Sequence, residues 1–199
     1  KVELTTTERA GFHRYTFKNA ENAHVIIDLE HRDKLLDANL EFVNDSTVQG
    51  FRRSKSWAED QHVFFYAVFN KKFDAILVVE EYNISPDTTM KLATRGALKF
   101  DLNEGEELLV KVGISAVDLE GAKKNLEAEI SGWDFDRVRT ESNQAWNKEL
   151  AKIDVEGAED DKVIFYSALY HTMIAPNLFS DVDGRYRKML RKDSVQQKT

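Results

Sequence analysis

Hydrophobic and polar residues alternate through most of the first 117 positions, which is the pattern of strands with one buried face. Short runs rich in β-branched and aromatic residues are separated by turn residues, and residues 8–11 resemble a hairpin connection. The predicted strands cover residues 2–7, 12–17, 24–29, 38–43, 47–53, 62–70, 73–80, 96–100 and 107–116. So many short strands, with no helix between them, favour antiparallel sheets stacked as a β-sandwich.

The hydrophobic period lengthens to that of a helix after Val117. A first helix is predicted from a cap at Asp118 to a stop at Gly132, and a second from about residue 136 to residue 153. The polar face of the first helix is expected to be solvated and carries Lys123, Lys124, Glu127 and Glu129.

A third helix is predicted to begin with Asp160 or Asp161 as its cap and to end before Pro176. Its apolar stripe consists of Val163, Tyr166, Leu169, Tyr170 and Met173. The polar tail, residues 192–199, is expected to be frayed. The predicted fold class is therefore mainly β: an antiparallel β-sandwich followed by helices.

Composition limits the classes of function. Of the 199 residues, 28 are basic and 35 are acidic, so the net charge of -7 argues against a nonspecific grip on nucleic acid or on an anionic membrane. The absence of cysteine removes disulfides, thiolate zinc sites and cysteine nucleophiles. No run of apolar residues is long enough to span a bilayer. The chain opens in strand-like sequence without a Met or a signal-peptide core, and we expect it to be part of something longer.

One histidine in a predicted strand is a first candidate for chemistry. Alternation places His13 on the same strand face as Tyr15 and Phe17. A histidine packed and hydrogen-bonded in the sandwich core is the favoured interpretation, over a contact with a ligand.

A turn before another predicted strand offers a second candidate. Trp57 and Asp60, with Glu59 and His62, could form a sugar-binding patch, because aromatic faces stack on pyranose rings and carboxylates accept hydrogen bonds from hydroxyls. The alternative is an ordinary turn that leads into the strand.

A glycine-containing loop after the third helix offers a third candidate. Asp181 and Asp183 could orient a substrate hydroxyl or bind a hard cation, or Ser180 and Asp181 could cap a turn. The spacing is not that of an EF-hand, so the sequence supports no calcium loop here.

Three segments, residues 3–17, 50–61 and 169–186, resemble glycoside hydrolase family 92 in residues, order and spacing. The resemblance runs from Val2 to about Arg187, and its most specific part is the Tyr170-His171 pair before residues 176–181 (PNLFSD). After Arg187 the family pattern usually continues with small and acidic residues, whereas residues 188–192 here are basic.

This resemblance implies a two-domain enzyme, in which linker helices join an N-terminal β-sandwich to an (α/α) toroid. It places the sandwich, incomplete at its N-terminus, at residues 1–117, the helical linker at 118–157 and the start of the toroid at 158–199. The implied activity is calcium-dependent, inverting release of mannose from α-linked mannosides, including N-glycans. The implied location is secreted, periplasmic or at the bacterial cell surface.

In the family, the general acid, the general base and the calcium ligands lie downstream in the toroid, so the resemblance assigns no catalytic or metal-binding residue to this chain. Calcium is expected in the parent enzyme and not in this fragment, which is expected to be inactive alone. Trp57, Asp60, Asp181 and Asp183 remain candidate substrate-binding residues. The alternative function is a carbohydrate-binding or purely structural β-sandwich module. The third helix is expected to mediate self-association if its stripe lacks partners.

Overall fold

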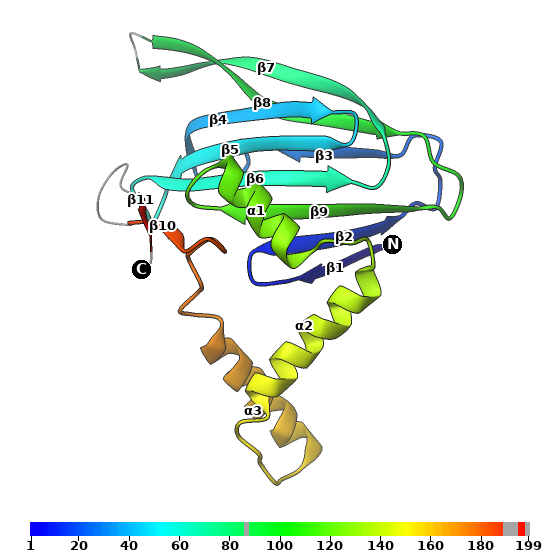
Figure 1. Ribbon diagram of the computed structural model, residues 1–199, viewed down its shortest axis with the longest axis vertical. Helices are drawn as coiled ribbons and strands as arrows, with labels where there is room; N and C mark the ends of the chain where they lie inside the picture. Colours follow the sequence, from blue (N-terminus) through cyan, green and yellow to red (C-terminus); the bar gives the residue numbers. More distant parts are fainter. Residues whose placement is uncertain (86–87, 189–194, 198–199) are drawn as a thin grey trace.

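The computed structural model describes the backbone of residues 1–85, 88–188 and 195–197, and the side chains of these residues outside 75–93. The elements run in the order β1 (Val2–Thr6), β2 (Ala10–Thr16), β3 (His24–Asp28), β4 (Lys34–Asn44), β5 (Thr47–Lys55), β6 (Gln61–Phe69), β7 (Phe73–Ser85), β8 (Thr88–Phe100), β9 (Glu107–Ser115), α1 (Leu119–Glu129), α2 (Phe135–Leu150), α3 (Glu159–Met173), β10 (Arg185–Arg187) and β11 (Val195–Gln197). All strands precede all helices except for the short last pair, as the hydrophobic pattern predicts (Figure 1).

The long strands form two antiparallel sheets. The larger sheet has the order β1-β2-β9-β6-β5-β4, and the smaller has the order β3-β8-β7. Neighbouring strands follow one another in the chain, except that β9 inserts between β2 and β6 in the larger sheet and that β3 pairs with β8 in the smaller one. The β-sandwich predicted from the sequence is confirmed.

The main hydrophobic core fills the space between the two sheets. Phe69 and Leu108 of the larger sheet pack there with Leu98 and Phe100 of the smaller one, and all four are buried. Gly96 allows close packing, since a β-carbon at this position would lie 2.7 Å from Leu40 Cδ2. Among the residues whose side chains are described, alternation along the central strands therefore buries the facing sides of the two sheets, which is the energetic basis of the sandwich.

A second core covers the outer face of the larger sheet. Phe12 of β2 packs there against Leu126 and Ile130 of α1 and against Phe135 of α2, with ring centroids of Phe12 and Phe135 5.4 Å apart. The side chain of Asp118 accepts a 2.6 Å hydrogen bond from the Gly121 amide and caps α1, as the sequence predicts. The sandwich thus carries a third, helical layer on one side.

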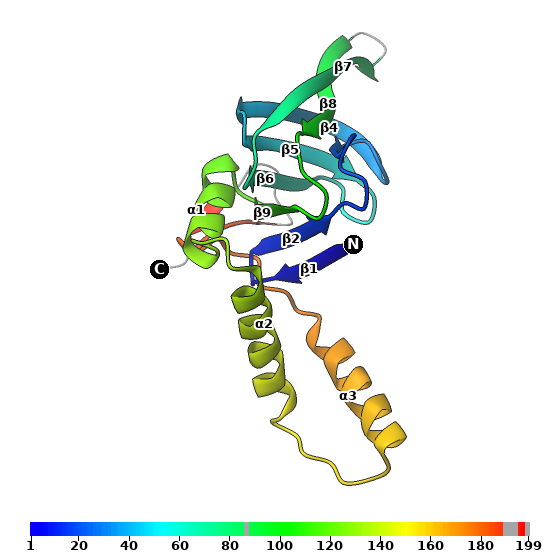
Figure 2. The same cartoon turned by 90° about the vertical axis from the view of Figure 1, so that its right-hand side faces the viewer.

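The helices α2 and α3 project away from the sandwich as a diverging pair (Figure 2). They meet near the edge-to-face pair of Trp146 and Tyr170, whose ring centroids are 4.6 Å apart. No residue of α3 is buried, and Val163 and Ile164 are 64% and 68% exposed. A helix that is apolar on most sides and exposed on most sides has unsatisfied packing surface.

Several boundaries differ from the sequence predictions. The helix α2 ends at Leu150 and not at residue 153, and β8 begins at Thr88 and not at residue 96. The N-cap of α3 is Ala158 with no side-chain hydrogen bond, so Asp160 and Asp161 lie in the first turn and do not cap it. The first helix ends at Glu129 and not at Gly132. In the tail, Val195–Gln197 pairs with Arg185–Arg187, so this part is not frayed. Of the basic stretch 188–192, positions 189–192 lie outside the described residues.

Candidate functional site

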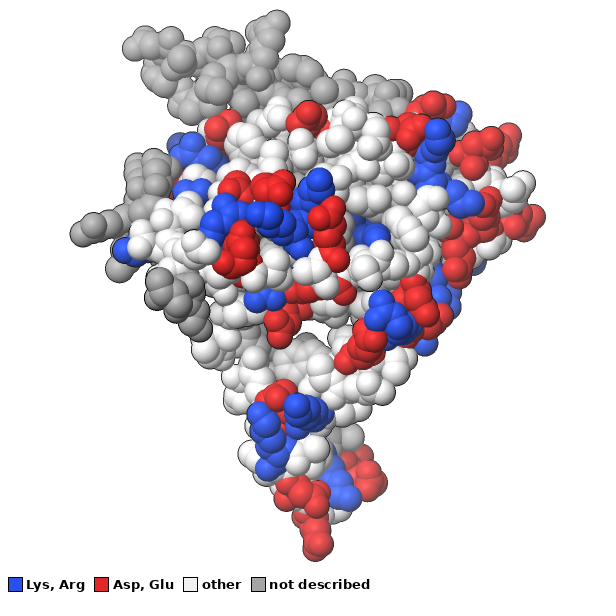
Figure 3. Space-filling view, viewed as in Figure 1, with Lys and Arg blue, Asp and Glu red and all other residues white. Residues whose placement is uncertain are grey.

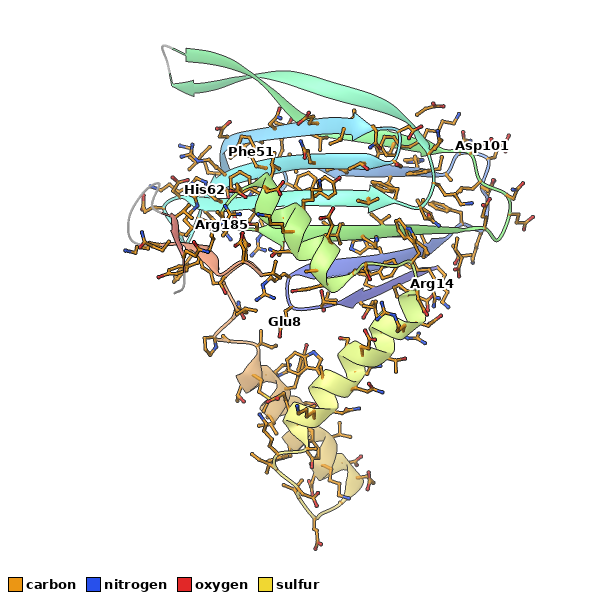
Figure 4. The ribbon with its side chains drawn as sticks, in the orientation of Figure 1. Glu8, Arg14, Phe51, His62, Asp101 and Arg185 are labelled. Atoms are coloured by element: carbon orange, nitrogen blue, oxygen red, sulfur yellow. The ribbon has the colours of Figure 1, made fainter. Side chains whose placement is uncertain are left out.

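The loops that carry the candidate residues gather at one end of the larger sheet. The register pairs Phe64 of β6 with Ser115 of β9, and Ala10 of β2 with Gly113. The β1–β2 turn, the β5–β6 connection and the end of β9 therefore lie at the same end. The chain returns there after α3, and Figure 4 shows His62 and Arg185 at this end, with Asp101 at the opposite one.

Asp181 is buried at this end and ties the returning segment to the sandwich. It is 4% exposed, its Oδ2 accepts a 2.8 Å hydrogen bond from Ser115 Oγ, and its Oδ1 accepts a 2.8 Å bond from Asn125 Nδ2. Asn125 Oδ1 in turn accepts from the amide of Val182 at 2.9 Å. We name these residues the Asp181 clamp: Ser115 of β9, Gly121 and Asn125 of α1, and Asp181.

Gly121 belongs to the clamp because the carboxylate of Asp181 occupies the place of a side chain. A β-carbon on Gly121 would lie 2.2 Å from Asp181 Oδ2 and 2.7 Å from Ser115 Oγ. The helix α1 therefore approaches the returning segment more closely than any residue except glycine permits.

An ion-pair network borders the clamp. Arg185 donates from Nη1 and Nη2 to Asp118 at 2.6 and 3.2 Å, and from Nε to Asp183 Oδ2 at 2.9 Å. Lys124 Nζ lies 3.6 Å from the same Asp183 oxygen. Burial raises the pKa of Asp183, but hydrogen bonds from Arg185 outweigh it, so this pKa lies below its ordinary value. Asp183 is thereby held ionised among cations.

The β1–β2 turn joins the same assembly through Arg9. Its Nη1 lies 2.6 Å from Glu129 Oε1, its backbone amide donates to Glu129 Oε2 at 2.8 Å, and its Nε donates to the Ser180 carbonyl at 2.7 Å. Thr7 also donates to Glu129 at 2.5 Å. The prediction that Glu129 lies on a solvated helix face is wrong, because this carboxylate links α1 to the turn.

The β5–β6 connection presents Trp57 to solvent. Trp57 is 92% exposed, and the ion pair between Lys55 and Glu59, 2.6 Å long, brackets it. At the base, Asp60 accepts from Arg53 Nη2 at 2.9 Å and lies 3.1 Å from His62 Nε2. Hydrogen bonding from Arg53 lowers the pKa of Asp60 despite partial desolvation, and His62 adds to the effect.

The four candidate residues therefore form two groups with different partners. Asp181 and Asp183 lie in one assembly between the sandwich, α1 and the returning segment. Trp57 and Asp60 lie on the neighbouring hairpin, where Trp57 is free to meet a ligand and Asp60 braces the turn. Both carboxylates of the first group are engaged by protein donors, which suits a positioning role.

His13 is half-buried beside Tyr15, which packs against the main hydrophobic core. Its Nδ1 is 2.8 Å from the Tyr15 hydroxyl, and burial lowers its pKa below the ordinary 6.5. The interpretation of a packed, hydrogen-bonded core histidine is confirmed.

A calcium ion does not fit the candidate carboxylates. Calcium binds six to eight oxygens, whereas both oxygens of Asp181 accept from Ser115 and Asn125, and Asp183 faces Arg185 and Lys124. Across the described part of the chain, His, Asp and Glu side chains nowhere gather in threes as a metal site requires.

The sequence did not reveal the residues that complete the assembly: Arg9, Ser115, Gly121, Asn125 and Arg185. One signal was available, since a glycine in the first turns of a helix lowers helix stability and often marks a close contact. Charged side chains of both signs are interspersed on the face that carries α1 (Figure 3).

Two family profiles match the chain in succession. The profile described as "Glycosyl hydrolase family 92 N-terminal domain" matches residues 1–115, and "Glycosyl hydrolase family 92 catalytic domain" matches residues 121–199. The gap between the two matches, residues 116–120, includes the start of α1, the helix that contributes Gly121 and Asn125 to the Asp181 clamp.

Solved structures show the same arrangement. A family GH92 α-mannosidase from Bacteroides thetaiotaomicron is 30% identical, with a TM-score of 0.85 over 100% of this chain and 28% of its own. A structure described as the same enzyme in complex with mannoimidazole gives 29% identity and a TM-score of 0.85, covering 100% of this chain and 27% of that one. A family GH92 inverting mannosidase from Bacteroides thetaiotaomicron VPI-5482, 22% identical, has the same fold, with a TM-score of 0.78 over 98% of this chain and 27% of its own.

A protein described as an uncharacterized secreted glycosidase from the fungus Arthroderma benhamiae is 25% identical over 88% of this chain and 26% of its own length. The chain thus spans little more than a quarter of the relatives that it matches. No helix among the described residues is both long and apolar enough to cross a membrane.

Proposed function

This chain belongs to glycosyl hydrolase family 92, since the N-terminal-domain profile covers residues 1–115 and the catalytic-domain profile most of the rest. From that premise we propose that it is the sandwich and first helices of an α-mannosidase, which releases mannose from α-linked mannosides and N-glycans with inversion and with calcium. The parent protein is proposed to act outside the cytoplasm of a bacterium, in keeping with the family resemblance.

The observation that carries this proposal is the continuous structural match to an α-mannosidase whose complex with mannoimidazole is known. It covers the whole chain at a TM-score of 0.85 and includes the returning segment as well as the sandwich. The match therefore covers one unit, which consists of the sandwich, α1 and the segment at residues 180–187.

The proposed role of this unit is to hold the catalytic domain in place. The Asp181 clamp and the Arg185 network join the sandwich to the segment that follows α3. The described carboxylates do not fit calcium, so we propose that the metal ligands, the general acid and the general base are supplied by other parts of the parent protein. By itself, the chain is proposed to be inactive.

A chimaera tests the proposal. Residues 1–187 would replace the matching quarter of the Bacteroides α-mannosidase, and mannose release from an α-mannoside would be measured with calcium and with a chelator. We expect calcium-dependent release by the chimaera and none by the 199-residue chain. A chimaera that folds but releases no mannose, or release by the chain alone, would contradict the proposal.

A second candidate function is a carbohydrate-binding module, and the exposure of Trp57 favours it. An indole that is 92% exposed on a hairpin braced by Asp60 and Arg53 is placed to stack on a sugar ring. Titration of the chain with mannobiose would show binding that is lost in Trp57→Ala and kept in the exposed-residue control Val43→Ala.

A further inference from the structure

An open groove lies between the β1–β2 turn, the middle of α2 and the end of α3. Its volume is about 550 Å³, within the range of roughly 300–1,000 Å³ that small-molecule sites occupy. It lies on the side of the β1–β2 turn that faces the projecting helices, and neither Trp57 nor the Asp181 clamp lines it.

The floor of the groove is apolar and held in place. Trp146 and Met173 line it beside Val138, which is 1% exposed. Trp146 packs edge-to-face against Tyr170 at 4.6 Å and an interplanar angle of 61°. This contact restricts the indole ring, and a ring fixed before binding loses little entropy when a ligand stacks on it.

The rim is made of carboxylates and hydroxyls. Glu8 comes from the turn and Glu141 and Glu149 from α2, and their side chains are 73%, 56% and 46% exposed. Thr7 and Ser142 add hydroxyls. Each carboxylate can accept several hydrogen bonds, so the rim offers acceptors around an aromatic floor.

The charges of the groove favour a neutral ligand. Its described lining includes no Lys or Arg, which disfavours phosphates and other anions. Each carboxylate already pairs with a cation close to it in sequence, Glu8 with Arg9, Glu141 with Arg137 at 2.7 Å, and Glu149 with Lys152. A cationic ligand would therefore gain little, whereas a ligand rich in hydroxyl groups would use the spare acceptor positions.

We propose that this groove binds hexopyranose units of an α-mannoside glycan, with one sugar face on Trp146 and hydroxyls donating to Glu141 and Glu149. A pyranose has an apolar C–H face and a ring of hydroxyl donors, which matches the floor and the rim. The inference rests on the proposed function, because that function supplies the glycan.

The test is calorimetric titration of the 199-residue chain with α-linked mannobiose. Trp146→Phe and Glu141→Gln should each weaken binding about fivefold or more, while the matched controls Trp133→Phe and Glu156→Gln, which lie outside the groove lining, should leave it unchanged. Circular dichroism confirms that each variant is folded. Because Glu141→Gln alters only an exposed side chain, the test stands even if Trp146→Phe fails to fold.

Three outcomes would overturn the proposal that the groove binds mannoside units. These are no binding of mannobiose, binding lost in Trp57→Phe but not in Glu141→Gln, and equal binding of cellobiose. The chimaera separates this inference from the proposed function. An active chimaera together with no mannobiose binding by the chain refutes the groove alone, and an inactive chimaera together with binding that depends on Glu141 refutes the mannosidase role alone.

Discussion

Gly121 and Asp181 are packed so closely that the carboxylate of one fills the side-chain position of the other: a β-carbon on Gly121 would lie 2.2 Å from Asp181 Oδ2. The two residues are 60 positions apart in the sequence, and the projecting helices α2 and α3 lie between them. Their contact fixes the returning segment on the sandwich, and it gives the first of four predictions.

Gly121→Ala should destabilise the chain by about 2 kcal/mol, because the added methyl group must displace a buried carboxylate and its partner Ser115. Urea unfolding measures the change. Gly132→Ala is the matched control, since nothing lies within 4 Å of a β-carbon there. Equal stability of the two variants would mean that the close contact is absent in solution.

The substitution Asp181→Ala tests whether Asp181 stabilises the fold or is available to bind substrate. Removal of the carboxylate leaves the buried donors of Ser115 and Asn125 without acceptors, so the free energy of unfolding should fall by about 2 kcal/mol. Limited proteolysis should also cut the segment around residue 181 faster. The exposed control Glu156→Ala should change stability by less than about 0.5 kcal/mol. If Asp181→Ala behaves like this control, the carboxylate is available for another role.

Stability should fall when the pH is lowered through the range in which His13 titrates. Burial lowers the pKa of His13 in the folded chain below 6.5, so the unfolded chain binds more protons as the pH drops below that value. The contribution is complete above about pH 6.5 and is lost as the pH falls through the pKa of the folded state. Between about pH 7.5 and about pH 5.5, the free energy of unfolding of His13→Gln should depend less on pH than that of the unsubstituted chain. Equal pH dependence would contradict this assignment.

The third helix should cause self-association, as its sequence predicts. Val163 and Ile164 are 64% and 68% exposed, and their burial in a partner would remove apolar area from water. Sedimentation velocity should show concentration-dependent oligomers, which Val163→Glu with Ile164→Glu converts to monomers. Val43→Glu on β4, a position 45% exposed, is the control. If the unsubstituted 199-residue chain stays monomeric at all concentrations, the prediction is refuted.

Much of the fold could be predicted because its cause is local. Alternation along residues 1–116 identifies the strands and their buried faces, and the change of period after Val117 identifies the helices. The cap at Asp118 follows from its own side chain and the next three residues. No local sequence pattern predicts the strand order, in which β9 inserts between β2 and β6.

The candidate site was predictable only in part, for the same reason. The sequence singled out residues 181–186 as a candidate segment, but the burial of Asp181 depends on its hydrogen bonds with Ser115 and Asn125, which are 66 and 56 positions away. Trp57 lies in a polar turn of the sequence, and its indole is exposed, as such a turn predicts. Glu129 lies on a helix face that the sequence predicts to be solvated, but its carboxylate accepts a hydrogen bond from the β1–β2 turn.

The sequence by itself determined that a sandwich precedes the helices, that Asp118 caps the first helix, and that the chain resembles its family. Only the tertiary structure decided which carboxylates are buried in hydrogen bonds with distant residues, which are exposed, and where a groove forms. Periodicity records which face of an element is buried, but a hydrogen bond or a cavity depends on where distant elements meet in space.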